Sequence, residues 1–154
     1  MKDAAAAITV RDARLSDLDF LVQAAMEVAR ESEGLVLDAV KARAGTRAVV
    51  EDRAKGRFFV AEMAGRAVAS LFVSYEWSDW NNVQYWWIQT AYSVPELRGK
   101  GCYKALYHGV LGVAKREGIG MVRLYVESHN TSGLRAYRGL GMTQTPYLVF
   151  EQRP

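Results

Sequence analysis

The loop at 94–101 and the pattern after it constrain the fold more than any other part of the chain. The segment reads VPELRGKG and continues as CYKALYHGVLGVAKREG: a strand end, a short basic loop and an amphipathic helical pattern. Gly99 and Gly101 let the backbone approach a ligand closely, and Arg98 and Lys100 add positive charge. Because free N–H groups at a helix N-terminus attract anions, the loop predicts a phosphate-binding site. The alternative is that the two glycines only form a tight turn.

Two other glycine-loop motifs fit the segment poorly. A dinucleotide-binding fingerprint requires a third glycine three residues after Gly101, where the chain has Lys104. A nucleoside-triphosphate loop requires Gly-Lys followed by Ser or Thr, whereas Gly101 is followed by Cys102 and Tyr103. Both motifs are therefore disfavoured.

Periodicity in the rest of the chain predicts alternating strands and helices, with breaks at Gly34 and Pro95. The expected strands are 8–11, 58–63, 67–75, 83–94, 121–126 and 147–151, and the expected helices are one that starts at Ser16, then 35–52, 103–117 and 132–138. Ala64 and Gly65 should form the turn of an antiparallel hairpin. The order β-α-α-β-β-β-α-β-α-β predicts an α+β fold, a mixed sheet with helices on its faces.

Composition limits the classes of protein open to the chain. Its 154 residues, 50% hydrophobic, suit one domain over 1–154, and no apolar run approaches the ~20 residues of a membrane span. Cys102, the only cysteine, is interpreted as a small helix-start residue rather than a nucleophile, and His108 and His129 are a poor basis for a metal site. The net charge is only +3, and the lysines and arginines are scattered along the sequence, which disfavours nucleic-acid binding. Without a secretory signal, a soluble cytoplasmic protein is expected.

A second motif, LYVESHNTSGLRAYRGLGM, follows one strand later, with Asn130, Tyr137 and a Gly-Leu-Gly-Met end at a characteristic spacing. On these residues the chain resembles the GNAT superfamily of acyl-CoA-dependent N-acyltransferases, as a small single-domain bacterial-type member. Arg98 and Gly101 match the family signature Arg/Gln-x-x-Gly-x-Gly/Ala. The resemblance covers 8–151 and implies about seven strands and about four helices. Tyr103 replaces the last small residue of the signature, so either its side chain points away from the phosphates or the loop geometry differs slightly from that of the family.

The resemblance implies acetyl-CoA as the ligand of the loop. The backbone N–H groups expected to hold its pyrophosphate are those of Arg98, Gly99, Lys100, Gly101, Cys102, Tyr103 and Lys104. Its pantetheine arm should pair with the backbone of Tyr92, Ser93 and Val94, where a splayed strand leaves bonding groups free. Asn130 should cap the next helix and contact the arm.

The implied chemistry requires a donor for the oxyanion, an acid for the leaving thiolate and a base for the amine. In the family the donor is a backbone N–H of the fourth strand, which corresponds to about Val94. Tyr137 is the expected acid, because a phenol of pKa about 10 can donate to a thiolate of pKa about 8.5; the alternative is a core tyrosine. The candidate bases are Glu76 and Glu127, each of which could instead be a solvated strand-end carboxylate.

The stretch YEWSDWNNVQYWW at 75–87 is rich in aromatic residues, which alternate between the two faces of a strand and so cannot all lie in one core. A substrate wall that attracts a cationic amine could be formed by Tyr75, Trp77 and Trp80, interleaved with Glu76 and Asp79. Gln89, which cannot act as a base, would join this wall, and Asp79 is a remote candidate for the base. The alternatives are core packing and a homodimer interface.

Two functions remain open at this point. The first is an acetyl-CoA-dependent N-acetyltransferase that acts by direct attack of a primary amine in a ternary complex, with a small cationic amine, or else a protein lysine or N-terminus, as the acceptor. The second is a non-catalytic acyl-CoA-binding module that serves as a sensor or in a complex. Tyr137 and the intact loop favour the enzyme, whereas the lack of an obvious base favours the module. The expected partners are the amine and a possible second copy in a homodimer, without nucleic acid or membrane.

Overall fold

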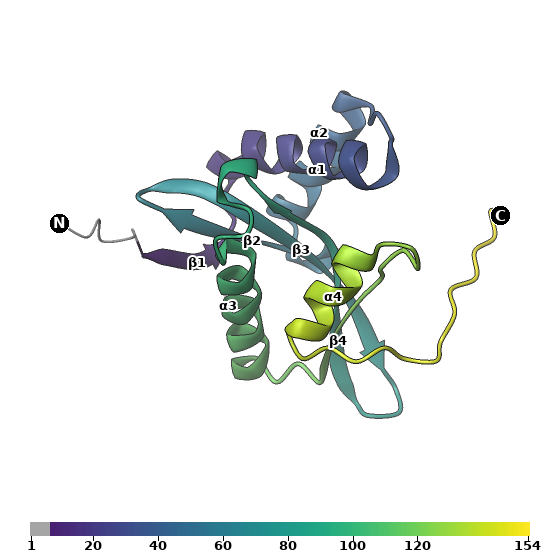
Figure 1. The fold of residues 1–154 in the computed structure, drawn as a ribbon. Coiled ribbons are helices and arrows are strands. Elements are labelled where there is room, and N and C mark those ends of the chain that lie inside the picture. The colour runs from purple at the N-terminus through teal and green to yellow at the C-terminus, as the bar shows by residue number, and fades with distance from the viewer. Residues whose placement is uncertain (1–6) are drawn as a thin grey trace.

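The computed structural model describes residues 7–154 as a mixed sheet with helices packed on it (Figure 1). The strands are β1 (Ile8–Asp12), β2 (Arg57–Met63), β3 (Arg66–Ser78), β4 (Val83–Ser93) and β5 (Met121–Leu124). The helices are α1 (Leu18–Glu33), α2 (Ala39–Glu51), α3 (Cys102–Arg116) and α4 (Thr131–Gly139). The strand order is β1-β2-β3-β4-β5, antiparallel except for the parallel pair β4–β5. The predicted α+β fold is confirmed, with five strands in the described part instead of about seven.

The core lies between the sheet and its helices, with α1 and α2 on one side of the sheet and α3 on the other (Figure 1). Trp86 of β4 is only 1% exposed, and its ring centroid lies 5.7 Å from that of Phe59 on β2. Leu106 of α3 is fully buried in the same core. Helix α3 approaches β1 so closely that a Cβ on Gly109 would lie 2.7 Å from the Cβ of Val10. The same core therefore packs β4 and α3 together, and the end of β4 and the start of α3 border the site described below.

Local signals in the sequence set most of the element boundaries. Gly34 ends α1 in the left-handed conformation, with φ 65°, as predicted. Helix α2 begins at Ala39 rather than at 35, because the Asp38 carboxylate accepts hydrogen bonds from the N–H groups two and three residues later, at 2.9 and 3.1 Å. Ala64 and Gly65 both have positive φ, 50° and 75°, which matches a type I′ hairpin turn and confirms the predicted β2–β3 connection.

The end of the chain differs from the expectation. Residues 143–154 form no strand, and Tyr147, Leu148, Val149 and Phe150 are between 62% and 89% exposed. The predicted strand at 147–151 is therefore wrong in this structure. These residues favour extended backbone, but a strand also needs a neighbouring edge with which to pair, and the segment leads away from the sheet (Figure 1). Strand β5 likewise ends at Leu124 instead of 126.

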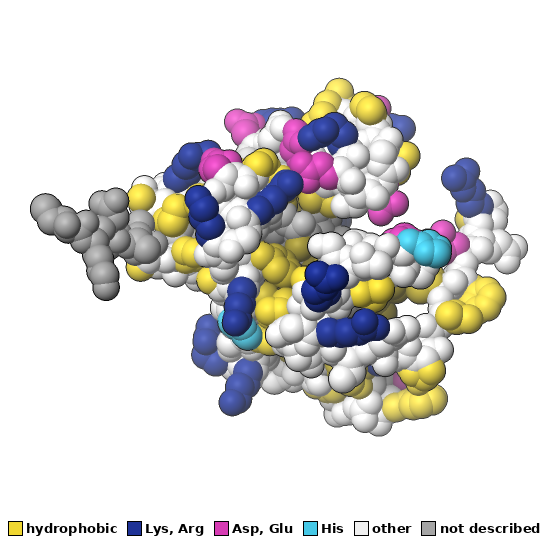
Figure 2. All heavy atoms as spheres, in the orientation of Figure 1, with side chains coloured by type: hydrophobic (Ala, Val, Ile, Leu, Met, Phe, Trp, Pro, Cys, Tyr) yellow, Lys and Arg dark blue, Asp and Glu magenta, His cyan; other side chains and the backbone are white. Residues whose placement is uncertain are grey.

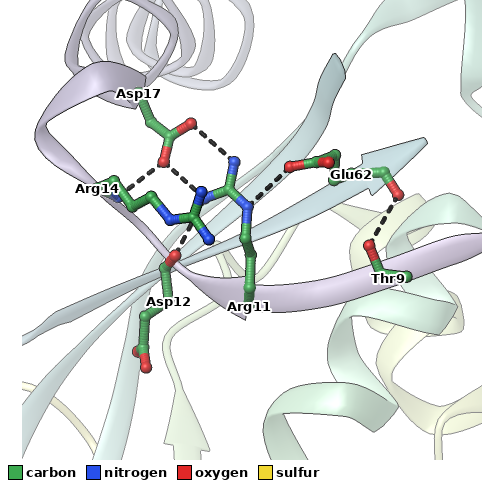
Figure 3. Close-up of polar contacts among 6 residues, drawn as sticks. All are labelled: Thr9, Arg11, Asp12, Arg14, Asp17 and Glu62. Carbon is green, nitrogen blue, oxygen red and sulfur yellow. Dashed lines mark hydrogen bonds and ion pairs between the residues drawn. The ribbon is translucent and has the colours of Figure 1, made fainter. Parts of the chain in front are cut away.

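A carboxylate cluster at the start of α1 ties this helix to β1 and β2 (Figure 3). Asp17 accepts hydrogen bonds from two guanidinium nitrogens of Arg11, at 2.7 and 3.0 Å, and from the backbone N–H of Arg14 at 2.7 Å. Arg11 also donates to Glu62 of β2 at 2.8 Å. The hydrogen bonds from Arg11 hold the pKa of Asp17 below its usual value. Asp17, rather than Ser16, therefore organises the start of the first helix.

Replacing Asp17 with Asn should lower the free energy of unfolding by about 2 kcal/mol at neutral pH, because hydrogen bonds to a charged partner are lost. The folded-state pKa of Asp17 is depressed, so its contribution is present above the unfolded pKa of about 3.9 and disappears as the pH falls through the folded-state value. Urea unfolding at several pH values should therefore show that the difference in free energy of unfolding between parent and variant becomes smaller in acid. The control is Asp19→Asn, which should have little effect, since the Asp19 side chain is 86% exposed. A gap that persists unchanged in acid would contradict this role.

Candidate functional site

Strands β4 and β5, at one end of the sheet, separate after a short paired stretch and leave one edge of β4 open. The two strands pair only from Tyr85 with Met121 to Ile88 with Leu124, whereas β4 continues to Ser93 beside β3. On the β3 side, the register skips Gln89, which forms a bulge at the point where the strands separate. The predicted splayed strand is therefore present, and it lies just before the glycine loop.

Hydrogen bonding determines which backbone groups of β4 face this opening. The N–H of Val94 donates to the carbonyl of Val68 at 3.0 Å. In an antiparallel pair, successive residues point their backbone groups to opposite sides, so those of Ala91 and Ser93 face away from β3 and into the opening. The expectation of a free N–H at Val94 is therefore wrong. Ala91 is the residue that the sequence interpretation missed, because its orientation depends on the register with β3.

A hollow lies at the open edge, between the end of β4, the start of α3 and α4. Its lining residues are Ala91, Tyr92, Ser93, Arg98, Tyr103, Ser132, Gly133, Ala136 and Tyr137. The structure thus brings together five residues predicted for the site, from the strand, the loop and the last helix. It adds three residues of α4 that sequence reasoning did not select, Ser132, Gly133 and Ala136. Small residues there leave room beside the strand.

The glycine loop bends back on itself before α3 begins. Gly99 and Gly101 have φ values of 73° and 81°, which glycine adopts without strain. The N–H groups of Arg98 and Lys100 donate within the loop, to the carbonyls of Pro95 and Leu97 at 3.2 and 3.3 Å. These two N–H groups are therefore not the free phosphate donors that the sequence suggested.

The first turn of α3 supplies the donors instead. A helix leaves its first N–H groups without intrahelical acceptors, and Gly101 at the N-cap has no side chain to satisfy them. The N–H groups of Cys102, Tyr103 and Lys104 therefore point out of the helix end, at the positive end of its dipole. Lys and Arg side chains gather on the face that carries α3 and α4 (Figure 2). Cys102 is buried, and burial raises the pKa of its thiol, which fits its interpretation as a helix-start residue.

Arg98 fastens the loop to its surroundings. Its Nε donates to the carbonyl of Ser93 at 3.1 Å, and its guanidinium pairs with Glu31 at the end of α1, at 2.9 Å. The guanidinium also lies 5.9 Å from the ring centroid of Tyr92. Arg98 is therefore a link between the open edge of β4 and the first helix as well as a positive charge.

Two tyrosines enter the hollow from opposite helices. Tyr137 lies on α4, whose N-cap Asn130 accepts a hydrogen bond from the N–H of Gly133 at 2.9 Å, as the sequence predicted. Burial raises the pKa of Tyr137, so its phenol stays protonated at neutral pH. Tyr103 of α3 lines the same hollow, and burial, with a smaller effect of Tyr137, raises its pKa strongly. The sequence predicted that this side chain points away from the phosphates, and in the structure it lines the hollow beside β4 and α4.

The candidate bases lie elsewhere. Glu76 accepts a hydrogen bond from the indole N–H of Trp87 and pairs with Arg123 at 3.2 Å, which occupies its carboxylate. Glu127 accepts from Ser128 and from the backbone N–H of His129, at 3.2 and 2.8 Å. Neither carboxylate lines the hollow. The hollow therefore contains the protonated phenol of Tyr137 without a carboxylate beside it.

The residues of the expected aromatic wall do not line the hollow either. Trp77 and Trp80 are 62% and 91% exposed near the turn between β3 and β4, which also contains Asp79. Gln89 donates its side-chain amide to Ser74 at 2.8 Å. None of these residues lines the hollow, so the structure does not bring the expected substrate wall to it.

A mixed sheet that splays between its fourth and fifth strands, with a glycine loop and a helix N-terminus at the opening, is the architecture of an acyl-CoA-dependent acetyltransferase. The chain belongs to the Acetyltransferase (GNAT) family, whose model it matches over residues 26–142. Acetyl-CoA is the acetyl donor of this family. No curated protein matches the chain.

Solved structures support the same assignment. A possible acetyltransferase from Clostridium difficile 630 is similar, with 34% identity, a TM-score of 0.91, and coverage of 96% of this chain and 97% of that one. The aminoglycoside N-acetyltransferase AAC(6')-Iy, solved with CoA, shares the fold at 14% identity, with a TM-score of 0.81 and 99% coverage of both chains. A ribosomal-protein-alanine N-acetyltransferase from Brucella melitensis biovar Abortus 2308 does so at 16% identity, with a TM-score of 0.77 and coverage of 96% and 99%. Within residues 7–154, no helix is long and apolar enough to cross a membrane.

Proposed function

We propose that this protein is an acetyl-CoA-dependent N-acetyltransferase that transfers the acetyl group directly to a primary amine in a ternary complex. The observation that carries the proposal is the shared hollow: the free backbone of β4 and the protonated phenol of Tyr137 face the same space. A thioester held along the strand would therefore meet a hydrogen-bond donor at its carbonyl and an acid at its sulfur.

Each part of the site has a role in this reaction. Acetyl-CoA supplies the acetyl group as a thioester. The N–H of Ala91 donates to the carbonyl oxygen as negative charge develops there, which is the role first assigned to Val94. Tyr137 gives its proton to the departing sulfur as the carbon–sulfur bond breaks, and the nitrogen now bonded to the acetyl carbon loses its second proton to solvent, from which the Tyr137 phenolate regains one. The first turn of α3 holds the diphosphate on its N–H groups, and Arg98 keeps the loop against β4.

The acceptor that we propose is a small cationic amine. Carboxylates of α1 stand beside the site: Glu31 pairs with Arg98, and Glu27 lies one turn earlier on the same helix. Both carboxylates are paired, Glu31 with Arg98 and Glu27 with Arg30, so they add little net negative charge, and the main support for a small amine is the aminoglycoside N-acetyltransferase that shares the fold. The similar structures include enzymes named for an aminoglycoside and for a ribosomal-protein alanine, so a protein amine is the second candidate. Because no carboxylate base lines the hollow, the amine loses its proton to water before attack.

The pH dependence of turnover should reflect the state of Tyr137. Its pKa is raised by burial above the ordinary value of about 10, so the acid remains protonated through neutral and mildly alkaline pH. The neutral, reactive fraction of the amine meanwhile grows with pH. Turnover at saturating substrates should rise from about pH 7 to about pH 9 without a descending limb below about pH 10. A descending limb near pH 8, at unchanged protein stability, would contradict the assignment of Tyr137.

The proposal is tested by thiol release from acetyl-CoA in the presence of a panel of amines. The panel contains polyamines, aminoglycosides, amino acids and a peptide with a free N-terminus and lysine, and mass spectrometry identifies the acetylated product. Release that depends on one amine class identifies the acceptor. Binding of acetyl-CoA without turnover on any amine would favour the non-catalytic module.

A further inference from the structure

Two buried hydroxyl groups in the described part of the chain have no hydrogen-bond partner, and both belong to the hollow. They are the Oγ of Ser93, at the open edge of β4, and the Oη of Tyr103, in the first turn of α3. Buried polar side-chain atoms are normally paired, since leaving one unpaired costs about 1–3 kcal/mol. Unpaired hydroxyls that border a ligand space indicate partners that arrive with the ligand.

The surroundings of the two hydroxyls define the chemistry of these partners. Ser93 lies on the open edge, where its own backbone N–H also faces the hollow. The ring centroid of Tyr103 lies 6.3 Å from that of Tyr107. Burial raises the pKa of the Tyr103 phenol, and the nearby Tyr137 raises it further. No Lys or carboxylate joins them in the lining, and the guanidinium of Arg98 is already engaged by Glu31. A buried site of this kind favours a neutral polar group over a charged one.

We propose that the side chains of Ser93 and Tyr103 form a hydrogen-bonding site for the amide groups of the pantetheine arm of acetyl-CoA. An amide offers both an N–H and a carbonyl, and a hydroxyl can donate or accept, so each hydroxyl can meet either group. The anionic diphosphate stays at the N–H groups of the α3 terminus. Tyr103, a bulky residue where the family signature has a small one, thereby adds side-chain contacts to recognition by backbone. This inference rests on the proposed binding of acetyl-CoA, but not on transfer to an amine.

Calorimetric titration of the full chain tests the site with two probes. CoA carries the pantetheine arm, whereas adenosine 3′,5′-bisphosphate contains only the nucleotide half. The variants Ser93→Ala and Tyr103→Phe should each weaken CoA binding about fivefold and the double variant about twentyfold or more, as expected for loss of one or two hydrogen bonds. Binding of the nucleotide half should not change.

Two further measurements separate this site from a structural role. The thermal midpoint of each free variant should equal or exceed that of the parent, because a buried, unpaired hydroxyl has been removed. Tyr107→Phe is the matched control, since Tyr107 is buried on the same helix but does not line the hollow, and CoA affinity should be unchanged.

The proposal is overturned if the two variants bind CoA within twofold of the parent, or if the nucleotide half loses affinity to the same extent as CoA. It is also overturned if the parent binds no CoA. A protein that binds CoA through these hydroxyls but acetylates no amine would support this site and reject the proposed reaction, so the two failures are distinguishable.

Discussion

Replacement of Tyr137 with Phe should lower turnover about 100-fold and leave the affinity for CoA within about threefold of the parent. The phenol is the only acid that we assign to the leaving thiolate, and its raised pKa keeps the proton in place at neutral pH. Phe retains the ring that borders the hollow, so the binding space should persist. Steady-state kinetics with the amine identified by the panel, together with CoA titration, measure both quantities.

Tyr125→Phe is the matched control for this substitution. Tyr125 is 55% exposed, stacks on Trp87 with ring centroids 4.5 Å apart, and does not line the hollow. The turnover of the Tyr125→Phe variant should equal that of the parent. If Tyr137→Phe retains full turnover, Tyr137 is not the acid, and another donor must protonate the thiolate.

Replacement of Trp86 with Ala should lower the free energy of unfolding by about 3–5 kcal/mol, as large-to-small core substitutions of aromatic residues do. Trp86 is 1% exposed and fills the space between the sheet and its helices against Phe59. Its removal leaves a cavity beneath the strand that carries the open edge. The variant should therefore stay folded, and bind CoA, only up to a lower temperature than the parent. Urea unfolding measures the loss directly.

Trp80→Ala provides a control with the same chemical change. Trp80 is 91% exposed at the β3–β4 turn, so its removal should alter the free energy of unfolding by less than about 0.5 kcal/mol. Equal losses for the two tryptophans would show that Trp80 is covered in solution, as the homodimer predicted from the aromatic surplus would require. That result would also place the aromatic stretch in an interface.

Features specified by neighbouring residues could be predicted from the sequence. Gly34 ends α1, Ala64 and Gly65 form the hairpin turn, and Asn130 caps α4, because each acts within a few residues of its own position. The glycine loop and Tyr137 were likewise found from motif spacing, and Arg98 of the loop and Tyr137 both line the hollow.

Features that depend on pairing between distant segments could not be predicted. The bulge at Gln89 and the register with β3 decide that Ala91 rather than Val94 faces the opening, and neither is visible in the strand's own sequence. The motif predicted only that the Tyr103 side chain points away from the phosphates; its place in the hollow depends on how α3 packs beside β4 and α4. Glu76 looked available as a base because its partner, Arg123, lies 47 residues away in the chain.

The most direct test of the central claim is amide hydrogen exchange, resolved by NMR, with and without CoA. If the cofactor lies along the open edge of β4, the N–H groups of Ala91 and Ser93 and those in the first turn of α3 should exchange more slowly when CoA is bound. Val94, already bonded to Val68, should change little. Protection confined to other segments, with Ala91 and Ser93 unaffected, would contradict binding at this edge and the reaction built on it.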